Sequence, residues 1–204
     1  MTIMIMIEIT ILTRSNDLVS HFIKPFPGIL VLGGDPAYTS VEFWSADNPG
    51  QDNCLVNNYP RTISTDPSAN FVAGKLVTCY GGQCEIYDNG VWKFLVYTRS
   101  SRTWHSSAQT EDRILLIGGS SSSTEWISLD GSASQNGPFT VRNPYCHCTI
   151  QLSPDLIVVT GGWSSSAYVT EYQLTTGTQR ILTNLNTGRS YHACGVYHNA
   201  GQQV

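Results

Sequence analysis

The sequence predicts an all-β protein assembled from repeated units of about 40 residues each. Three observations support this prediction. A glycine pair follows an apolar run at four places in the 204 residues, at 33–34, 81–82, 118–119 and 161–162. Turn signals such as Asp-Asn-Gly and Asn-Gly-Pro separate short runs of β-branched and aromatic residues. No apolar pattern with the helical period of about 3.6 residues extends over the length of a helix.

The composition fits a turn-rich β protein and argues against two kinds of partner. Charged residues make up 13% of the chain, below the roughly 25% of an average soluble domain, and the chain has 18 Gly and 9 Pro. The formal net charge of -4 offers no electrostatic basis for binding nucleic acid. No basic run could hold the chain to an anionic membrane. We therefore expect no nucleic-acid partner and no membrane insertion.

Residues 1–17 form an expected β-like extension ahead of the repeats. Isoleucine stands at every second position from Ile3 to Ile11, and this period of two is typical of a strand. The segment is a poor signal peptide, because no basic residue precedes the apolar run and Glu8 interrupts it. It is also too short to span a bilayer. We expect this strand to be able to pair with an open sheet edge, and the compartment stays open between cytoplasmic and secreted.

Each repeat unit is expected to contain four short strands. The apolar run is the second strand, and after the glycines a variable loop leads to a third strand with an aromatic residue: SVEFWS, CEIYDNG, TEWISLDG and YVTEYQL. The fourth strands are expected at NCLVNNY, VWKFLVY, PFTV and QRILT. The first strand of three units carries a histidine, namely His21, His105 or His147, and His192 begins the pattern again. The second unit has NFVAG in its place.

These units resemble kelch repeats, each of which forms one blade of a β-propeller. The resemblance rests on the apolar run with Gly-Gly, the spaced aromatic residue, and Arg-x-x-His on the next first strand. Arg102 to His105 and Arg189 to His192 carry that last element cleanly, and the instance that ends at His147 is stretched by two residues. WD repeats would instead show Gly-His and Trp-Asp patterns, which do not recur here.

The resemblance covers residues 18–197 and implies a kelch-type propeller of about four four-stranded blades. Because kelch propellers commonly have about six or seven blades, the chain looks like a fragment of a longer ring. Residues 189–197 would begin a further blade. Residues 198–204 would then be a truncated C-terminal end.

The repeated glycines and histidines are expected to be architectural. The glycines end the buried second strand where strands converge, leave no side-chain volume there and allow positive φ. The histidines come from different blades, so we expect structural hydrogen bonds rather than a shared metal ion. This structural set comprises Gly33, Gly34, Gly81, Gly82, Gly118, Gly119, Gly161, Gly162, His105, His147 and His192.

The six cysteines leave the redox state of the chain open. Cys146 and Cys148 are separated by one residue, which is not the spacing of a zinc site. Cys79 and Cys84 could place two sulfur atoms close together across a tight turn, with Cys54 as a rival partner for either. Disulfides and buried unpaired thiols are equally good interpretations.

The candidate binding surface is a loop face. In a four-stranded blade, the loops that join strands two to three and four to one open on the same side, and such loops commonly carry binding residues. Arg, Trp and Tyr dominate interface energetics. The candidate partner-binding residues are therefore Arg99, Arg102, Trp163, Arg189 and Tyr191. Trp163 has no counterpart in the other units, whereas a repeated arginine more often braces the blade.

The sequence contains no catalytic motif such as Gly-x-Ser-x-Gly or His-Glu-x-x-His. We therefore expect a non-enzymatic module that binds a protein partner through the loop face, with no cofactor and no catalytic or metal-binding residue. One alternative is a galactose-oxidase-like copper enzyme, which would need a cysteine bonded to a tyrosine. The adjacent Cys–Tyr pairs at 79–80 and 145–146 do not support it, because neighbours on a strand point to opposite faces. Another alternative is an extracellular domain that recognises a glycan or a protein, suggested by the cysteines and aromatic residues.

Overall fold

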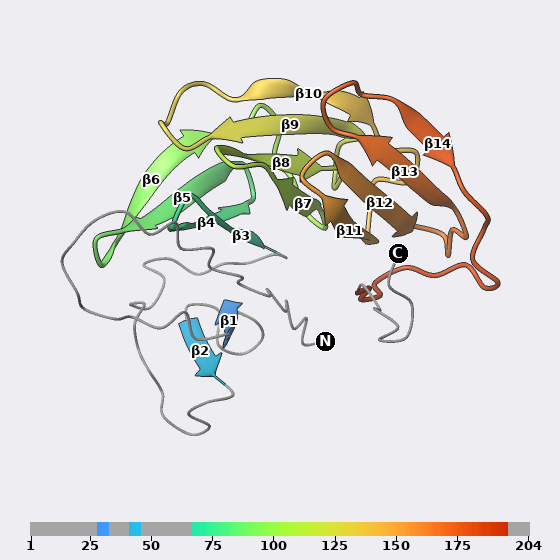
Figure 1. Ribbon diagram of the computed structural model, residues 1–204, viewed down its shortest axis with the longest axis horizontal. Helices are drawn as coiled ribbons and strands as arrows, with labels where there is room; N and C mark the ends of the chain where they lie inside the picture. The colour runs from blue at the N-terminus through green and yellow to red at the C-terminus, as the bar shows by residue number, and fades with distance from the viewer. Residues whose placement is uncertain (1–27, 33–40, 46–66, 196–204) are drawn as a thin grey trace.

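The computed structural model describes residues 28–32, 41–45 and 67–195, the first two ranges by their backbone alone. Every regular element in this part of the chain is a strand, so the prediction of an all-β protein is confirmed. Twelve strands form three four-stranded antiparallel sheets, and β1 (Gly28–Leu32) pairs with β2 (Val41–Ser45) (Figure 1). The predictions for the extension at 1–17, for His21, Gly33 and Gly34, and for the end at 198–204 lie outside the described residues.

The three four-stranded sheets follow one another along the chain. The first consists of β3 (Ser68–Val72), β4 (Lys75–Tyr80), β5 (Gln83–Asp88) and β6 (Val91–Tyr97). The second consists of β7 (Ser106–Gln109), β8 (Arg113–Ile117), β9 (Ser123–Ser128) and β10 (Gln135–Thr140). The third consists of β11 (His147–Ser153), β12 (Leu156–Gly161), β13 (Val169–Gln173) and β14 (Gln179–Ile181). In each sheet, strands that are consecutive in the chain are neighbours.

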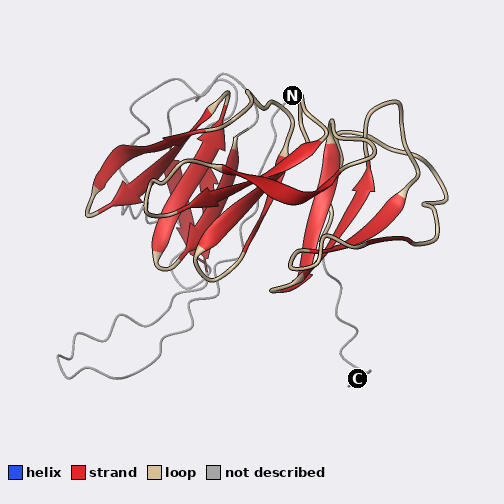
Figure 2. Ribbon diagram, turned by 90° about the horizontal axis from the view of Figure 1, so that it is seen from above, coloured by secondary structure: helices blue, strands red, loops and turns tan. Residues whose placement is uncertain are grey.

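The sheets lie side by side in an arc, with the first strand of each sheet on the inside (Figure 1). β7 contacts β3 in the first sheet and β11 in the third. The last strands, β6, β10 and β14, lie on the outside of the arc. Seen from above, the loops and turns lie at the two ends of the strands (Figure 2). Because the strands alternate in direction, the loops between sheets and the loops after β4, β8 and β12 share one end, which we call the loop face.

The second strand of the middle sheet is apolar because both of its faces are covered. In β8, Ile114 and Leu116 belong to an apolar cluster shared with the first sheet, whereas Leu115 and Ile117 belong to one shared with the third. All four side chains are fully buried. Alternate side chains point to opposite faces of a strand, so a sheet packed between two others requires a continuous apolar run. The expected burial of the second strand is confirmed, and each of these side chains stabilises the fold by about 1.5–3 kcal/mol.

A tight hairpin replaces the loop between β4 and β5. Tyr80 pairs with Gln83, which leaves only the glycine pair at 81–82 in the turn. Both glycines have positive φ, at 62° and 155°, and two-residue hairpin turns favour glycine for that reason. Cys79 and Cys84 lie directly opposite each other on the two strands and form a disulfide. The structure therefore contains the Cys79–Cys84 pair that the sequence suggested across a tight turn.

A second disulfide joins the third sheet to the segment that follows it. Cys148 of β11 is bonded to Cys194, which lies 46 residues later in the segment after β14. The bond ties this segment, which contains no strand between residues 182 and 195, to the first strand of the sheet. Cys146 is buried and lies outside both disulfides.

Candidate interaction surface

Three loops with the same local structure lie on the loop face. Each contains a residue in the left-handed conformation immediately before a histidine: Trp104 with φ of 56°, Cys146 with 55° and Tyr191 with 53°. Positive φ is uncommon for residues other than glycine. Its recurrence at three positions shows that the loops fold alike, although the second one is stretched in sequence.

Equivalent positions in these loops are found by counting back from the histidines and not from the arginines. The residue three places before each histidine is Arg102, Pro144 or Arg189. The carbonyl oxygen of that residue accepts a hydrogen bond from a glycine N–H at the end of the preceding sheet's second strand: Gly81 at 3.2 Å, Gly119 at 2.6 Å and Gly162 at 3.0 Å. The repeated feature at this position is therefore a backbone carbonyl. Arg142, the arginine of the stretched sequence motif, is five residues before His147 and is therefore not equivalent to Arg102 and Arg189.

Backbone hydrogen bonds also join the loops to one another. The N–H of Tyr191 donates to the carbonyl of Cys146 at 3.0 Å, and the N–H of Cys146 donates to the carbonyl of Trp104 at 3.2 Å. The three left-handed residues therefore form one chain of backbone contacts that crosses from sheet to sheet. This chain fixes the positions of the loops independently of their side chains.

Each histidine ring is held by a hydroxyl group of the preceding sheet. The Nε2 distances are 2.9 Å from His105 to Ser68 Oγ, 2.7 Å from His147 to Ser106 Oγ and 2.9 Å from His192 to Thr160 Oγ1. Burial lowers the pKa of His105 to about 3 and that of His147 to about 4, and it also lowers the pKa of His192. The rings are therefore neutral near pH 7. Hydrogen bonds between sheets are the role that these contacts support.

Glycine is required where a second strand ends against the next histidine. A Cβ atom on Gly118 would lie 2.7 Å from Cε1 of His147 and 2.6 Å from the carbonyl oxygen of Pro144. A Cβ atom on Gly161 would likewise overlap the ring of His192. Both glycines also have positive φ, so a side chain would add backbone strain to the overlap. At these two positions the backbone therefore has room only for glycine.

Arg102 is a brace inside the second sheet. Its side chain is 2% exposed, and all five of its N–H donors are used. Nη1 donates to the carbonyls of Gly118 at 2.7 Å and Ser123 at 2.8 Å, and Nη2 donates to Ser123 Oγ at 2.9 Å. Nε and Nη2 both bond Oε2 of buried Glu125, at 3.3 and 3.2 Å. This placement favours the bracing interpretation over partner contact, so we leave Arg102 out of the candidate surface.

Glu125 is a structural residue that the sequence-based reasoning missed. Its other oxygen, Oε1, accepts a hydrogen bond from the backbone N–H of Arg99 at 2.6 Å, so one carboxylate holds the loop between the sheets at two points, Arg99 and Arg102. The signal was present in the sequence, because each of the four aromatic segments contains a glutamate, at 42, 85, 125 and 171.

Four aromatic side chains from the loops of the loop face form two pairs. Trp104, Trp163 and Tyr191 are 38%, 55% and 45% exposed, and Tyr145 is half-buried. The ring centroids of Trp104 and Tyr145 are 6.1 Å apart, and those of Trp163 and Tyr191 are 6.4 Å apart. The two pairs are linked, since the N–H of Trp163 donates to the carbonyl of Tyr145 at 2.9 Å. We call these four residues the aromatic row.

The loop that carries Trp163 is held in a strained conformation. Ser164 and Ser165 follow it with φ of 60° and 54°, two consecutive left-handed residues that are not glycine. Ser166 anchors the loop, because its N–H donates to the carbonyl of Gly162 at 3.2 Å and its Oγ accepts from Nδ2 of Asn143 at 2.7 Å. Strain of this kind persists only where the surroundings impose it, and it is often found at binding sites.

The structure divides the five predicted partner-binding residues. Trp163, Tyr191 and Arg189 are exposed in neighbouring loops, and the N–H of Arg189 donates to the carbonyl of Ser166 at 3.0 Å. Arg102 is buried, and Arg99 is exposed beside a groove along β6. The sequence-based reasoning did not include Trp104 and Tyr145, although an aromatic residue stands one or two places before each described histidine.

The chain matches no protein-family model and no curated protein sequence. Within the described ranges, no helix is long and apolar enough to cross a membrane. In the same part of the chain, no group of three or more His, Cys, Asp or Glu side chains is arranged to hold a metal ion.

Lowering the pH should destabilise the fold through the buried histidines. Their ordinary pKa is 6.5, and burial lowers it to about 3 for His105 and about 4 for His147. Above about pH 6.5 both states of the protein are neutral at these groups, and as the pH falls the unfolded chain takes up the protons first. The free energy of unfolding should therefore fall by about 1.4 kcal/mol per pH unit for each histidine between about pH 6.5 and 4.

Urea unfolding at several pH values measures this slope. The His147→Gln variant is the control, and its slope should be shallower than that of the parent chain by about 1.4 kcal/mol per pH unit. A free energy of unfolding that stays constant between pH 7 and pH 5 would contradict the neutral buried rings.

Replacing Arg102 should be far more costly than replacing an exposed arginine. Arg102→Ala leaves Glu125 as an uncompensated buried charge, and we expect a loss of about 3–5 kcal/mol in the free energy of unfolding. The matched control is Arg180→Ala, which breaks the exposed pair with Glu171 at 3.1 Å and should cost at most about 1 kcal/mol. Urea unfolding at pH 7 measures both values. Equal losses in the two variants would show that the bracing role is wrong.

Proposed function

We propose that this chain is a non-enzymatic interaction module, a kelch-type β-propeller fragment that binds a partner protein through its loop face. The aromatic row is the observation that carries the proposal. Its four rings come from loops that backbone hydrogen bonds already hold in place. A rigid aromatic surface loses little conformational entropy on binding, and Trp and Tyr are enriched among residues that dominate binding energy.

The repeated sheets support the propeller part of this proposal. Three four-stranded antiparallel sheets have their first strands adjacent, their second strands buried and one glycine–histidine contact repeated at two of the junctions. A propeller blade has this strand order, and kelch blades carry glycine and histidine at these places. With the sequence unit around residues 33–34, the chain would supply about four blades of a ring of about six or seven.

The composition of the loops supports the binding part. The described loops at 98–105, 118–122, 141–146, 162–168 and 182–195 contain Ser, Tyr, Trp, Asn, Gly and Arg, and no Asp or Glu. The same residue types predominate in antibody binding loops, where aromatic residues provide rigid contact area and small polar residues provide adaptable hydrogen bonds. Such loops suit recognition of a protein surface.

Substituting two residues of the aromatic row should weaken partner binding strongly. Biotinylated protein would capture and cross-link the partner from an extract, and mass spectrometry would identify it. With the purified partner, Trp163→Ser combined with Tyr191→Ser should raise Kd about 30-fold or more, the effect of losing one hot spot. The control is Ile181→Ser, which removes an exposed apolar side chain from β14 and should leave Kd unchanged. Equal binding by the double variant and the parent chain would rule out the loop face.

The two disulfides favour a second proposal, that recognition takes place outside the cell. Disulfides persist in oxidising compartments and are rare in the cytosol. Protein extracted in the presence of a thiol-blocking reagent should retain the Cys79–Cys84 and Cys148–Cys194 bonds in mass spectra recorded without reduction. Alkylated thiols at these four positions would contradict an extracellular location. The experiment does not depend on the nature of the partner, so it separates location from binding.

Metal analysis of the purified protein would distinguish the copper-enzyme alternative from the interaction module. It requires a cysteine bonded to a tyrosine, and the structure pairs Cys79 with Cys84 and places the hydroxyl of Tyr80 3.2 Å from Oε1 of Glu85. Stoichiometric copper in the purified protein would favour the enzyme over the interaction module.

A further inference from the structure

Residues 182–195, which we call the tethered segment, follow the third sheet and are bonded back to β11 by the disulfide of Cys194. The segment contains no strand, yet it supplies Arg189 and Tyr191 to the loop face. Tyr191 forms one of the two aromatic pairs with Trp163, with ring centroids 6.4 Å apart. The position of this pair therefore depends on how firmly the tethered segment is held.

The tethered segment has backbone hydrogen bonds to the third sheet and its loops but no buried side chain. The N–H groups of Leu182 and Leu185 donate at 2.8 Å, and those of Arg189 and Tyr191 donate at 3.0 Å. Every side chain of residues 182–195 is exposed or half-buried, so none of them anchors the segment in an apolar cluster. Segments with few buried contacts open locally at a low cost in free energy, so the disulfide is an important restraint on this one.

The two disulfides differ in their access to solvent. Cys79 and Cys84 are 2% and 0% exposed and belong to the apolar cluster between the first two sheets. Neither Cys148 nor Cys194 is buried. A thiolate has to reach a sulfur atom to reduce a disulfide, so access is one of the factors that set the rate. A reductant therefore opens the Cys148–Cys194 bond more readily than the bond inside the cluster.

We propose that the Cys148–Cys194 disulfide is a redox switch, which holds the tethered segment on the loop face when oxidised and releases it when reduced. The reductant is a dithiol. One of its thiolates attacks a sulfur atom of the bond and forms a mixed disulfide, and its second thiol then displaces the remaining protein sulfur. The protein gains two electrons and two protons as two cysteine thiols, and the dithiol becomes a cyclic disulfide.

Reduction takes apart one end of the aromatic row. The bond spans 46 residues, and a disulfide that closes a long loop strongly restricts the open conformations of the chain. Once the bond is open, Tyr191 separates from Trp163, and Arg189 separates from the loop that carries Trp163. The consequence for binding rests on the proposed function: the oxidised chain binds the partner tightly, and the reduced chain binds it weakly.

Graded reduction of the folded protein tests the difference between the two bonds. The protein is incubated with increasing concentrations of dithiothreitol, its thiols are alkylated, and the alkylated positions are mapped by mass spectrometry. Cys148 and Cys194 should be alkylated at a dithiothreitol concentration at least about tenfold lower than Cys79 and Cys84, because they are more accessible. Alkylation of all four positions at the same concentration would overturn the proposal.

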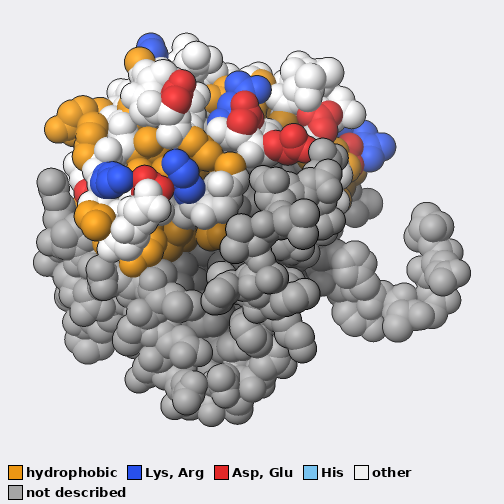
Figure 3. Space-filling view, turned by 60° about the vertical axis from the view of Figure 1, so that its left-hand side comes forward, with side chains coloured by type: hydrophobic (Ala, Val, Ile, Leu, Met, Phe, Trp, Pro, Cys, Tyr) orange, Lys and Arg blue, Asp and Glu red, His pale blue; other side chains and the backbone are white. Residues whose placement is uncertain are grey.

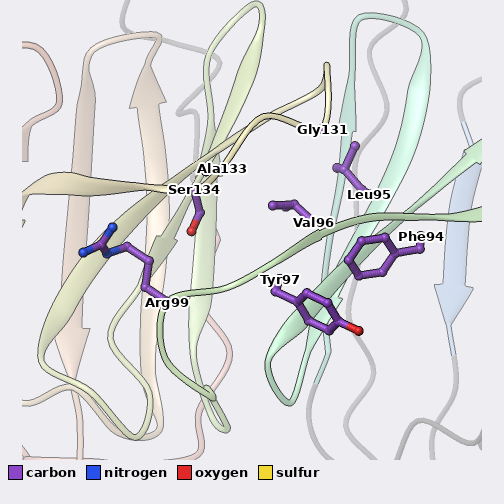
Figure 4. A pocket seen from close by; sticks show the side chains of 8 residues that line it. All are labelled: Phe94, Leu95, Val96, Tyr97, Arg99, Gly131, Ala133 and Ser134. Carbon is purple, nitrogen blue, oxygen red and sulfur yellow. The ribbon is translucent and has the colours of Figure 1, made fainter.

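Strand β6 provides a reference for the other disulfide. Val96 of β6 pairs with Cys84, and Leu95 and Val96 line a groove of about 430 Å³ whose other side is the turn between β9 and β10 (Figure 4). A space-filling view shows hydrophobic side chains gathered on the described surface of this side of the molecule (Figure 3). The first sheet lies at the opposite end of the arc from the third. Amides of residues 94–97 therefore report on the Cys79–Cys84 bond and not on the tethered segment.

Hydrogen exchange measures the release without any partner. After selective reduction, amides of residues 189–191 should exchange at least about tenfold faster, whereas those of residues 94–97 and of β8 should keep their rates. The variant with Cys148→Ser and Cys194→Ser should show the same fast exchange without reductant. The matched control is Ser190→Ala, which alters the tethered segment, keeps the bond and should keep the slow exchange.

Two outcomes of the exchange experiment would overturn the switch. One is equal exchange at residues 189–191 in the oxidised parent chain and in the double serine variant. The other is equally accelerated exchange in β8, which would mean that the bond holds the whole fold rather than the tethered segment.

Partner binding separates this proposal from the proposed function. With the purified partner, the variant with Cys148→Ser and Cys194→Ser should raise Kd about 30-fold or more, as the loss of the Trp163–Tyr191 pair does. Fast exchange at residues 189–191 with an unchanged Kd would overturn the control of binding by this bond. The proposed function itself fails only if Trp163→Ser combined with Tyr191→Ser leaves Kd unchanged.

Discussion

The contact between a glycine and the histidine of the next sheet is the constraint on which the rest of the structure depends. At Gly118, the backbone lies so close to the ring of His147 that no side chain fits between them. The ring in turn reaches Ser106 Oγ at 2.7 Å, in the same sheet as that glycine. Because burial keeps the imidazole neutral, it can hold this position without the cost of a buried charge. Sheet spacing follows from this contact.

Backbone atoms complete the junction and leave the neighbouring side chains unconstrained. The carbonyl of Pro144 and the left-handed residue Cys146 hold the loop by main-chain hydrogen bonds. Since the equivalent left-handed residues are Trp104 and Tyr191, the same backbone accepts a small buried thiol or a large exposed ring. The chemistry of the loop face can therefore change from one sheet to the next while the junction stays the same.

Periodic features of the sequence predicted the fold well, and features set by backbone or by distant partners could not be predicted. The apolar run at 114–117 reveals its own burial, because both alternating sets of side chains are large and apolar. Arg102 lies in a loop, and its burial depends on Glu125, 23 residues away in β9, so no local pattern around Arg102 shows it.

Side-chain patterns in the sequence were misleading on two points: which loop positions are equivalent, and which aromatic residues are exposed. Arg142 shares its residue type with the arginines of the other loops, but the position requires only a carbonyl, which every residue has, and Pro144 supplies it. Trp163 is an aromatic residue without a counterpart in the other units, but Trp104, whose position before a histidine is repeated, is also exposed on the loop face. Repetition does not exclude a binding role where the repeated element is the backbone conformation.

The outer strands lie away from the glycine–histidine contacts between sheets, so those contacts do not constrain their sequences. Every sheet packs against the next one in the same way, so the inner contacts repeat. An outer edge faces solvent, and its sequence is constrained only by the need to prevent an unwanted strand from pairing with it. Different features prevent strand addition at the different edges: Pro138 in β10, and a length of only three residues in β14. In β6 the single charge, Lys93, is held by Asp88 and leaves Phe94 and Tyr97 exposed. The pairing of β6 with β5 has a register shift between the partners of Cys84 and Glu85, so an irregular ladder discourages strand addition at this edge as well.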